Sequence, residues 1–172
     1  NIKPMKILLQ HKIFIGYFLL MAIIGRITKK IGIMGASAGG HLASTAATHY
    51  TKDCRPDFQL LLYPVISMRQ EITHQGSRQN LLGKNPSDEQ IEFFSNELQV
   101  NAQTPPALLI HCSDDRAVVP ENSIRYYQAL LAHKVPATLL CYPKGGHGWG
   151  FSNKFAFKKI WLEEVRKWLE ML

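Results

Sequence analysis

Cysteine is scarce in this sequence, and its shortage excludes two classes of protein. The 172 residues include only three cysteines, Cys54, Cys112 and Cys141, and no two of them form a C-x-x-C pair. An odd number without that spacing argues against a disulfide framework and against a zinc site. Cys112 and Cys141 lie inside apolar runs, where cysteine acts as a small core residue. The cysteines therefore leave the cellular compartment open.

Acidic residues are also in short supply. There are 13 Asp and Glu against 20 Lys and Arg, which gives a formal net charge of +7. Such an excess suits an anionic partner, but the basic residues are scattered and no run of them alternates with aromatic residues. We therefore predict a solvated basic surface and no nucleic-acid partner. No H-x-x-x-H pair and no grouping of carboxylates suggests a metal site, so no metal ion is expected.

The apolar run at residues 13–25 falls short of the roughly 20 residues that a membrane span needs. It lies between Lys12 and Arg26, and its length is typical of a signal-peptide core. However, no A-x-A-like cleavage site follows, and a predicted core strand begins almost at once. We favour a buried helix or strand over a signal or anchor segment, since short apolar runs fit both. No stable membrane insertion is expected.

The rest of the chain alternates between predicted strands and predicted helices, and its length suits one domain. Short apolar runs predict four buried parallel strands at 30–34, 58–63, 107–112 and 138–142. Helices are predicted at 38–49, 121–133 and 155–172. This alternation indicates an α/β fold with a mainly parallel sheet flanked by helices.

Residues 67–106, which we call the insertion, interrupt this alternation. The segment is polar, and one helix is predicted in it, at 87–98. Ser87 is a suitable N-cap for this helix, and Gln90 completes a capping box. Long connections of this kind are usually lids or binding loops, so we expect the insertion to lie above the sheet.

A G-x-S-x-G motif spans Gly35 to Gly39, directly after one predicted strand and directly before a helix. A serine nucleophile on a strained turn requires this context. We predict that Ser37 is the nucleophile and that the N–H of Ala38 faces the developing oxyanion. The alternative to a catalytic role is a tight turn whose small residues are present only for steric reasons. His41 lies one helical turn further on, whereas a general base must approach from a separate loop, so we interpret it as structural.

An acid and a base follow in the chain order Ser, acid, His, each after a later predicted strand. The acid is one of the adjacent pair Asp114 and Asp115; we prefer Asp115, because it stands in D-x-x-V with Val118 anchoring the loop on the core. His147 lies between glycines, in a loop able to bring its imidazole to both Ser37 and the acid. These three side chains predict acyl transfer through an acyl-enzyme.

From residue 31 onward the chain resembles the bacterial acetylxylan esterase and feruloyl esterase-like branch of the α/β-hydrolases, which is related to the prolyl oligopeptidases. The segments that carry this resemblance include I-G-I-M-G-A-S-A-G-G-H-L-A-S, R-P-D-F-Q-L-L-L-Y-P-V-I-S-M and Y-P-K-G-G-H-G-W-G. The resemblance implies removal of acetyl groups from xylan or xylo-oligosaccharides, without a metal or organic cofactor. Because the implied substrate is a polysaccharide, the resemblance also implies a secreted or periplasmic location, with a cytoplasmic location as the alternative. It says nothing about the oligomeric state.

The N-terminus departs from this pattern. Members of the branch carry further strands before the nucleophile, with an H-G-G-type loop that supplies a second oxyanion N–H. Residues 1–30 resemble neither that loop nor the usual polar helix. We therefore expect an atypical apolar segment at 1–30, and the C-terminal part of a hydrolase catalytic domain at 31–172.

Substrate contacts are harder to predict than the three catalytic candidates. Five residues are candidates for a sugar site, because they follow strands or lie in the insertion: Tyr63, His74, Arg78, Asn80 and Trp149. The alternative for Arg78, Asn80 and Trp149 is simple packing of the loops. Two other functions stay open, namely a serine peptidase of the prolyl-oligopeptidase type and an inactive hydrolase remnant.

Overall fold

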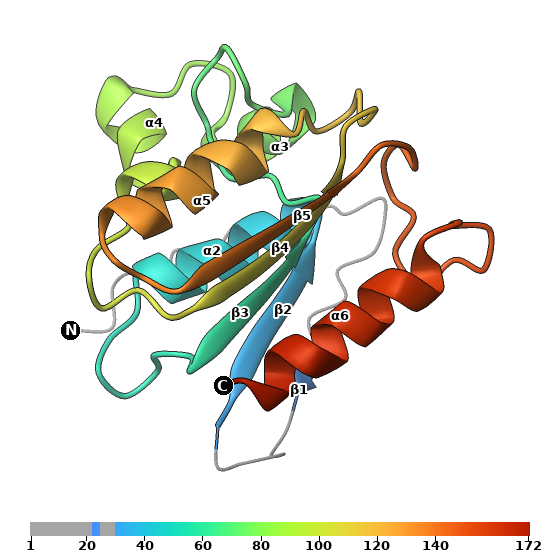
Figure 1. The fold of residues 1–172 in the computed structure, drawn as a ribbon. Coiled ribbons are helices and arrows are strands. Elements are labelled where there is room, and N and C mark those ends of the chain that lie inside the picture. The colour runs from blue at the N-terminus through green and yellow to red at the C-terminus, as the bar shows by residue number, and fades with distance from the viewer. Residues whose placement is uncertain (1–21, 25–29) are drawn as a thin grey trace.

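The computed structural model describes residues 22–24 and 30–172 (Figure 1). The apolar run at 13–25 therefore lies outside the described residues, except for its residues 22–24. The backbone of these three residues forms β1, Ala22–Ile24. The remainder of the predicted segment 1–30, apart from Lys30, also lies outside the described residues.

Four parallel strands make up most of the sheet, as the sequence predicts. The strand order is β1-β2-β3-β4-β5, and only β1 runs antiparallel to its neighbour. The parallel strands are β2 Gly32–Ala36, β3 Phe58–Leu62, β4 Ala107–Cys112 and β5 Ala137–Tyr142. The first begins and ends two residues later than predicted, so it leads directly into Ser37.

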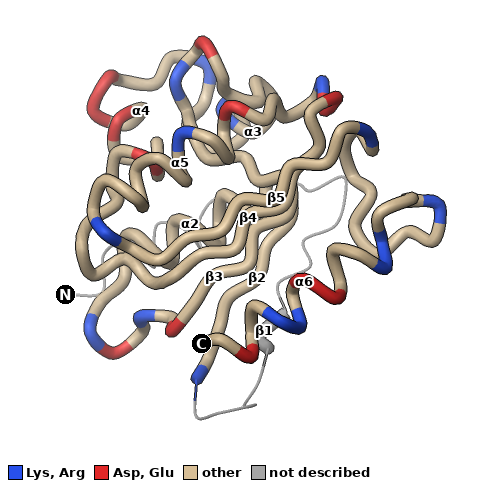
Figure 2. The backbone as a smooth tube through the Cα atoms, in the orientation of Figure 1, with Lys and Arg blue, Asp and Glu red and all other residues tan. Residues whose placement is uncertain are grey.

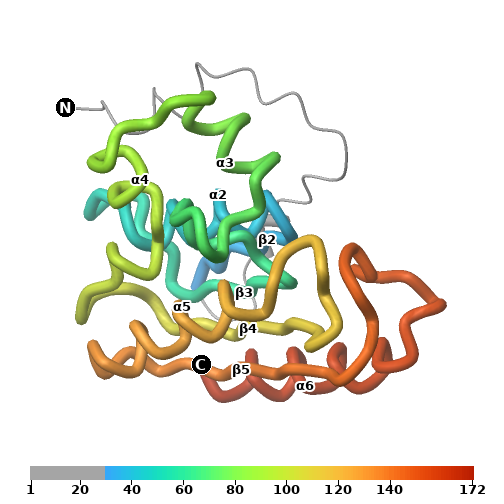
Figure 3. The backbone as a smooth tube through the Cα atoms, turned by 90° about the horizontal axis from the view of Figure 1, so that it is seen from above, coloured from blue at the N-terminus to red at the C-terminus, as the bar shows by residue number. Residues whose placement is uncertain are grey.

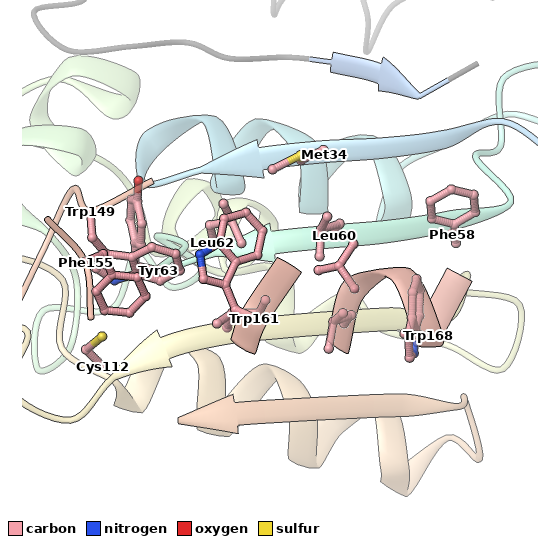
Figure 4. Close-up of a cluster of buried hydrophobic side chains, with 13 residues drawn as sticks. Met34, Phe58, Leu60, Leu62, Tyr63, Cys112, Trp149, Phe155, Trp161 and Trp168 are labelled. Carbon is pink, nitrogen blue, oxygen red and sulfur yellow. The ribbon is translucent and has the colours of Figure 1, made fainter. Parts of the chain in front are cut away.

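Helices cover both faces of this sheet (Figure 1). On one face α6, Lys158–Glu170, packs through Trp161 and Trp168 against Leu60 and Leu62 (Figure 4). On the other face lie α2, Ala38–Thr48, and α5, Glu121–Ala132, against Leu61 and its neighbours. Successive strand residues point to opposite faces, so a strand buried along its whole length, such as F-Q-L-L-L, supplies both cores.

The insertion contains more helix than predicted. It holds α3, Gln75–Leu82, then α4, Asp88–Phe94, and a 3-10 turn η1, Asn96–Leu98. The capping box of Ser87 and Gln90 is confirmed, but the predicted helix is interrupted at Ser95, whose backbone is extended. The sequence did not reveal α3, because only two of its eight residues are strongly apolar. Seen from above, α3 and α4 lie on the side of the sheet that carries α2, away from α6 (Figure 3).

Hydrogen bonds join the insertion to α2 and to His49, the residue that follows it. His41 Nε2 donates to the Phe94 carbonyl at 2.8 Å, and His49 Nε2 donates to the Phe93 carbonyl at 3.0 Å. Asn96 is fully buried and donates to Ser44 Oγ at 2.7 Å. His41 thus binds the last carbonyl of α4, which agrees with its interpretation as a structural residue.

Charged residues of both signs are interspersed along the chain (Figure 2). Within residues 22–24 and 30–172, no helix is long and apolar enough to cross a bilayer. The same described residues contain no group of three or more His, Cys, Asp or Glu arranged to hold a metal ion.

Candidate active site

Ser37 lies on the sharp turn that joins β2 to α2. Its φ of 55° is positive, which is a strained conformation for a residue other than glycine. Two backbone hydrogen bonds hold this turn against the chain that leaves β3: Ser37 N–H donates to the Leu62 carbonyl at 3.0 Å, and Val65 N–H donates to the Ser37 carbonyl at 3.0 Å. Strain at a serine so firmly held is typical of a nucleophile elbow.

The glycines around Ser37 are required by close backbone approach. A Cβ on Gly35 would lie 2.1 Å from the carbonyl oxygen of Gly39, and one on Gly40 would lie 2.5 Å from Cβ of Pro64. Neither neighbour can move freely, because one is backbone and the other a proline ring. The small residues therefore allow α2 to begin directly at the end of β2.

His147 bridges the other two predicted residues. Its Nε2 lies 2.7 Å from Ser37 Oγ, and its Nδ1 lies 2.7 Å from Asp115 Oδ2. The flanking glycines have positive φ, with Gly146 at 60° and Gly148 at 76°, and glycine adopts such angles without strain. Three segments distant in sequence thus place Ser37, His147 and Asp115 in one continuous hydrogen-bonded chain.

Only one of the two adjacent aspartates reaches the imidazole. Asp115 Oδ1 accepts hydrogen bonds from the backbone N–H groups of Ala117, at 2.9 Å, and Val118, at 3.0 Å, which turns Oδ2 towards His147. Asp114 Oδ1 accepts instead from the backbone N–H of Gly146 at 2.8 Å. Asp115 therefore contacts the ring of His147, whereas Asp114 supports the loop that carries it.

Asp115 is held in its ionised form. Burial disfavours its charge, but hydrogen bonds from His111 and His147 outweigh this effect and keep the pKa of Asp115 well below its usual value. An ionised carboxylate accepts the Nδ1–H of His147 and leaves Nε2 free to accept the Ser37 proton.

Tyr63 supports His147 from the end of β3. Its ring lies edge-on to the imidazole, with the ring centres 4.8 Å apart. The backbone of Tyr63 has a φ of 35°, so it is strained like that of Ser37. Burial raises the pKa of the Tyr63 hydroxyl above its usual value. Tyr63 is 5% exposed and serves here mainly as a wall behind the imidazole.

The predicted oxyanion donor is well placed in the fold. Ala38 is the first residue of α2, so its backbone N–H has no acceptor within the helix. The positive end of the helix dipole also lies at this point. An N–H in this position is free to donate to a developing oxyanion beside Ser37.

Of the other predicted substrate contacts, only Trp149 lies against Tyr63, with ring centres 4.7 Å apart. Trp149 is 5% exposed and stacks on Phe155 with ring centres 4.3 Å apart, so it lies within the core (Figure 4). Arg78 donates to Gln70 Oε1 at 2.7 Å within the insertion, and Asn80 is exposed on α3. For Trp149 and Arg78, this placement agrees with the packing alternative.

His74 is the predicted substrate contact that borders an open cavity. The cavity has a volume of about 400 Å³ and lies between the start of the insertion and the loop after Asp115. His74 also lies in the electrostatic field of the site, because burial and the neighbouring His147 both lower its pKa. The cavity is lined by Glu71, Ile72, Thr73, His74, Gln75, Gly76, Arg116, Ala117 and Val119.

One residue close to the site was missed from the sequence. His111 on β4 is fully buried and its Nε2 lies 3.3 Å from Asp115 Oδ2. The signal available was a histidine within the otherwise apolar strand A-L-L-I-H-C, because a buried polar side chain needs hydrogen-bond partners.

The mainly parallel sheet, with Ser37 between a strand and a helix and with Asp115 and His147 after two later strands, defines the α/β-hydrolase class. Only part of that fold is described here. The model of the prolyl oligopeptidase family matches residues 26–172, and the chain belongs to this family.

Two relatives share extended sequence similarity with the chain. It is 40% identical over 146 residues to an acetylxylan esterase from Xylanibacter ruminicola, covering 83% of this chain and 30% of that protein. It is 39% identical over 136 residues to endo-1,4-beta-xylanase B from Butyrivibrio fibrisolvens, covering 73% of this chain and 21% of that protein. The chain thus spans less than a third of the length of either relative.

Solved structures show the same fold. An acetyl ester-xyloside bifunctional hydrolase from Caldicellulosiruptor lactoaceticus matches with a TM-score of 0.77 and 41% identity, over 81% of this chain and 56% of that one. A carboxylesterase from Lactobacillus plantarum WCFS1 matches with a TM-score of 0.67 and 24% identity, over 83% of this chain and 58% of that one. The second similarity concerns the fold alone.

Proposed function

We propose that this chain carries the catalytic residues of a serine carboxylic-ester hydrolase. The observation that carries the proposal is the hydrogen-bonded chain from Ser37 Oγ through His147 to Asp115, with 2.7 Å at each step. A serine hydroxyl is a weak nucleophile until a base accepts its proton, and this arrangement supplies both the base and the carboxylate that orients it.

In the proposed reaction, His147 Nε2 takes the proton of Ser37 as Oγ bonds to the ester carbonyl carbon. The resulting oxyanion accepts a hydrogen bond from the N–H of Ala38. The C–O bond to the alcohol then breaks, and the alcohol leaves with the proton held by His147. Water, deprotonated by the same imidazole, attacks the acyl-enzyme and releases the acid, which restores Ser37.

We further propose acetylated xylan or xylo-oligosaccharide as the substrate. The acetylxylan esterase and the acetyl ester-xyloside hydrolase to which the chain is similar support this choice by their names. The open cavity beside His74 is suited to a bulky polar group attached to the ester. A polysaccharide substrate would place the protein outside the cytoplasm, in a secreted or periplasmic location.

Reaction with a fluorophosphonate tests the nucleophile directly. We expect a covalent adduct on Ser37, hydrolysis of an aryl acetate by the unmodified protein, and loss of both in Ser37→Ala with unchanged thermal unfolding. A protein that forms no adduct would be the inactive remnant. Cleavage of a proline amide without any ester hydrolysis would favour the peptidase, for which the family's name is the supporting observation.

Sugar recognition is tested by comparing two substrates. We expect His74→Ala to reduce activity on acetylated xylo-oligosaccharides by about tenfold, since one lost hydrogen bond to a charged or polar partner is worth about 1 to 2 kcal/mol. Activity on a simple aryl acetate should change much less. Gln79→Ala, at an exposed position of α3, the helix whose N-cap is His74, is the matched control. An equal loss on both substrates in His74→Ala would argue against a sugar site at this cavity.

A further inference from the structure

His111 contacts the same carboxylate oxygen of Asp115 as His147 does. Its side chain is fully buried in β4. Its Nε2 lies 3.3 Å from Asp115 Oδ2 and 2.9 Å from the carbonyl oxygen of Val118, while its Nδ1 lies 2.8 Å from Ser123 Oγ on α5. Every polar atom of this imidazole therefore has a partner, and one of these partners is the predicted catalytic acid.

The partners determine where the imidazole carries its proton. Both oxygens beside Nε2 are acceptors only, since one belongs to an ionised carboxylate and the other to a backbone carbonyl. Nε2 must therefore carry the hydrogen. Nδ1 is then the acceptor in the neutral ring, and the hydroxyl of Ser123 donates to it. Ser123 thus selects the form of His111 that carries its N–H at Nε2, where the N–H donates to the Val118 carbonyl at 2.9 Å and lies beside Asp115 Oδ2.

The geometry points to His111 as a positioning residue for the catalytic acid, with Ser123 fixing its orientation. This inference rests on the proposed function. Two backbone N–H groups hold Oδ1 of Asp115, but Oδ2 is shared between the two imidazoles of His111 and His147. The N–H at Nε2 of His111, between the Val118 carbonyl and Asp115 Oδ2, lies beside the same oxygen that accepts from His147.

Burial makes this contact necessary. The side chain of Asp115 has no exposed surface, and an ionised carboxylate is costly to bury unless each oxygen has donors. The groups that face His111 are the Asp115 carboxylate, the Val118 carbonyl and the Ser123 hydroxyl, with Cys141 opposite it in the strand register. Among the described residues, Asp115 is the only carboxylate that contacts the imidazole of His111.

The test compares His111→Leu with His111→Gln. Leucine removes the donor and keeps an apolar filling, whereas the amide nitrogen of glutamine can occupy a position similar to that of Nε2. We expect kcat for an aryl acetate to fall by about tenfold or more in His111→Leu with KM little changed, the range typical of residues that orient a functional group. His111→Gln should recover most of this loss.

Two further readouts separate positioning from simple packing. In His111→Leu the low-field proton resonance of the hydrogen bond between His147 and Asp115 should shift or broaden. The acidic limb of the kcat/KM profile should move to higher pH, because a carboxylate with one donor fewer binds the imidazolium more strongly. A role confined to packing would change neither readout.

Ser123→Ala provides a second test, which does not depend on the folding of His111→Leu. It should lower kcat less than His111→Leu does, and it should shift the same low-field proton resonance of the hydrogen bond between His147 and Asp115. Tyr126→Phe is the matched control, since it also removes one buried hydroxyl from α5, where Tyr126 donates to Gln59 Oε1 at 3.0 Å.

Unchanged kcat, resonance and pH profile in His111→Leu or Ser123→Ala would overturn the inference. Absence of a fluorophosphonate adduct in the unmodified protein would instead overturn the proposed function, while the resonance would still test the contact of His111 with Asp115.

Discussion

At the scale of single residues, the adjacent aspartates show how the same side chain takes two roles. Asp115 contacts the imidazole of His147, and Asp114 accepts a backbone N–H from the loop that carries this histidine. The backbone N–H groups of Ala117 and Val118 decide between them, because they hold Oδ1 of Asp115 and thereby direct Oδ2.

Asn substitutions distinguish the two aspartates. We expect Asp115→Asn to lower kcat by about ten-thousandfold, because an amide can favour the wrong imidazole tautomer and cannot stabilise the imidazolium. Asp114→Asn keeps an acceptor oxygen for the Gly146 N–H, so its kcat should fall far less. Steady-state hydrolysis of an aryl acetate by both variants is the measurement. Equal losses would mean that the acid has been assigned to the wrong residue.

A residue-scale prediction also concerns the turn at Ser37. A Cβ on Gly35 would meet the backbone of Gly39 and Gly40 at 2.1 to 2.8 Å. We expect Gly35→Ala to lower the free energy of unfolding by about 1 to 3 kcal/mol and to displace Ser37, which reduces fluorophosphonate labelling. Urea unfolding and labelling rates check the two effects. Unchanged stability together with full labelling would contradict this description of the turn.

At the scale of secondary-structure elements, the insertion depends on α2 for its position. The predicted capping box starts α4, but hydrogen bonds from His41 and Asn96 fix the place where this helix ends and η1 begins. The helix that carries Ser37 at its start therefore also supports the insertion along its length.

Histidine burial predicts that this junction weakens in acid. Burial lowers the pKa of His41 from 6.5 to about 4, although its bond to the Phe94 carbonyl partly opposes the shift. Between pH 6.5 and pH 4 the unfolded chain therefore binds a proton at this residue that the folded chain does not. The free energy of unfolding should fall across this window by about 3 kcal/mol more in the unmodified protein than in His41→Gln.

Urea unfolding at several pH values measures this effect. His133→Gln is the control, because His133 is an exposed histidine at the end of α5. We expect that variant to follow the unmodified protein across the whole window. A His41→Gln variant with the same pH dependence as the unmodified protein would show that His41 is not buried in its neutral form.

At the scale of the whole molecule, two apolar cores hold the helices on opposite faces of the sheet. Trp161 is 1% exposed and is the more deeply buried of the two tryptophans that α6 contributes to its core, where it contacts the ring of Trp149 (Figure 4). This core also reaches Tyr63, which lies against His147. The core that packs α6 against the sheet therefore also supports Tyr63 beside the imidazole of His147.

Truncation of Trp161 tests this connection. We expect Trp161→Ala to lower the free energy of unfolding by about 3 to 5 kcal/mol, because it leaves a large cavity in a packed core. Leu162→Ala, at the neighbouring and partly exposed position, is the control and should cost much less. Urea unfolding of both variants gives the comparison. A loss in Trp161→Ala as small as that in the control would show that α6 is not anchored through this side chain.

Sequence alone predicted those secondary-structure elements and site residues that a local sequence pattern marks. Four apolar runs gave the parallel strands, because strands buried on both faces need no alternation of polar residues. The motif around Ser37 and the glycines around His147 mark the backbone conformations that their turns need, so both residues could be named before their positions were known. The helix α3 escaped prediction because it buries none of its residues and thus has no apolar pattern.

Tertiary structure decided the contacts of those side chains whose partners are distant in the chain. Asp114 and Asp115 are identical side chains, and only the folded loop shows which of them reaches His147. From the sequence Trp149 is a candidate sugar contact, yet its side chain lies in the core. His111 lies in an apolar strand, yet its imidazole contacts Asp115. The physical reason is that local sequence sets backbone preference and burial, whereas the direction of a polar side chain is set by hydrogen-bond partners that only folding brings within reach.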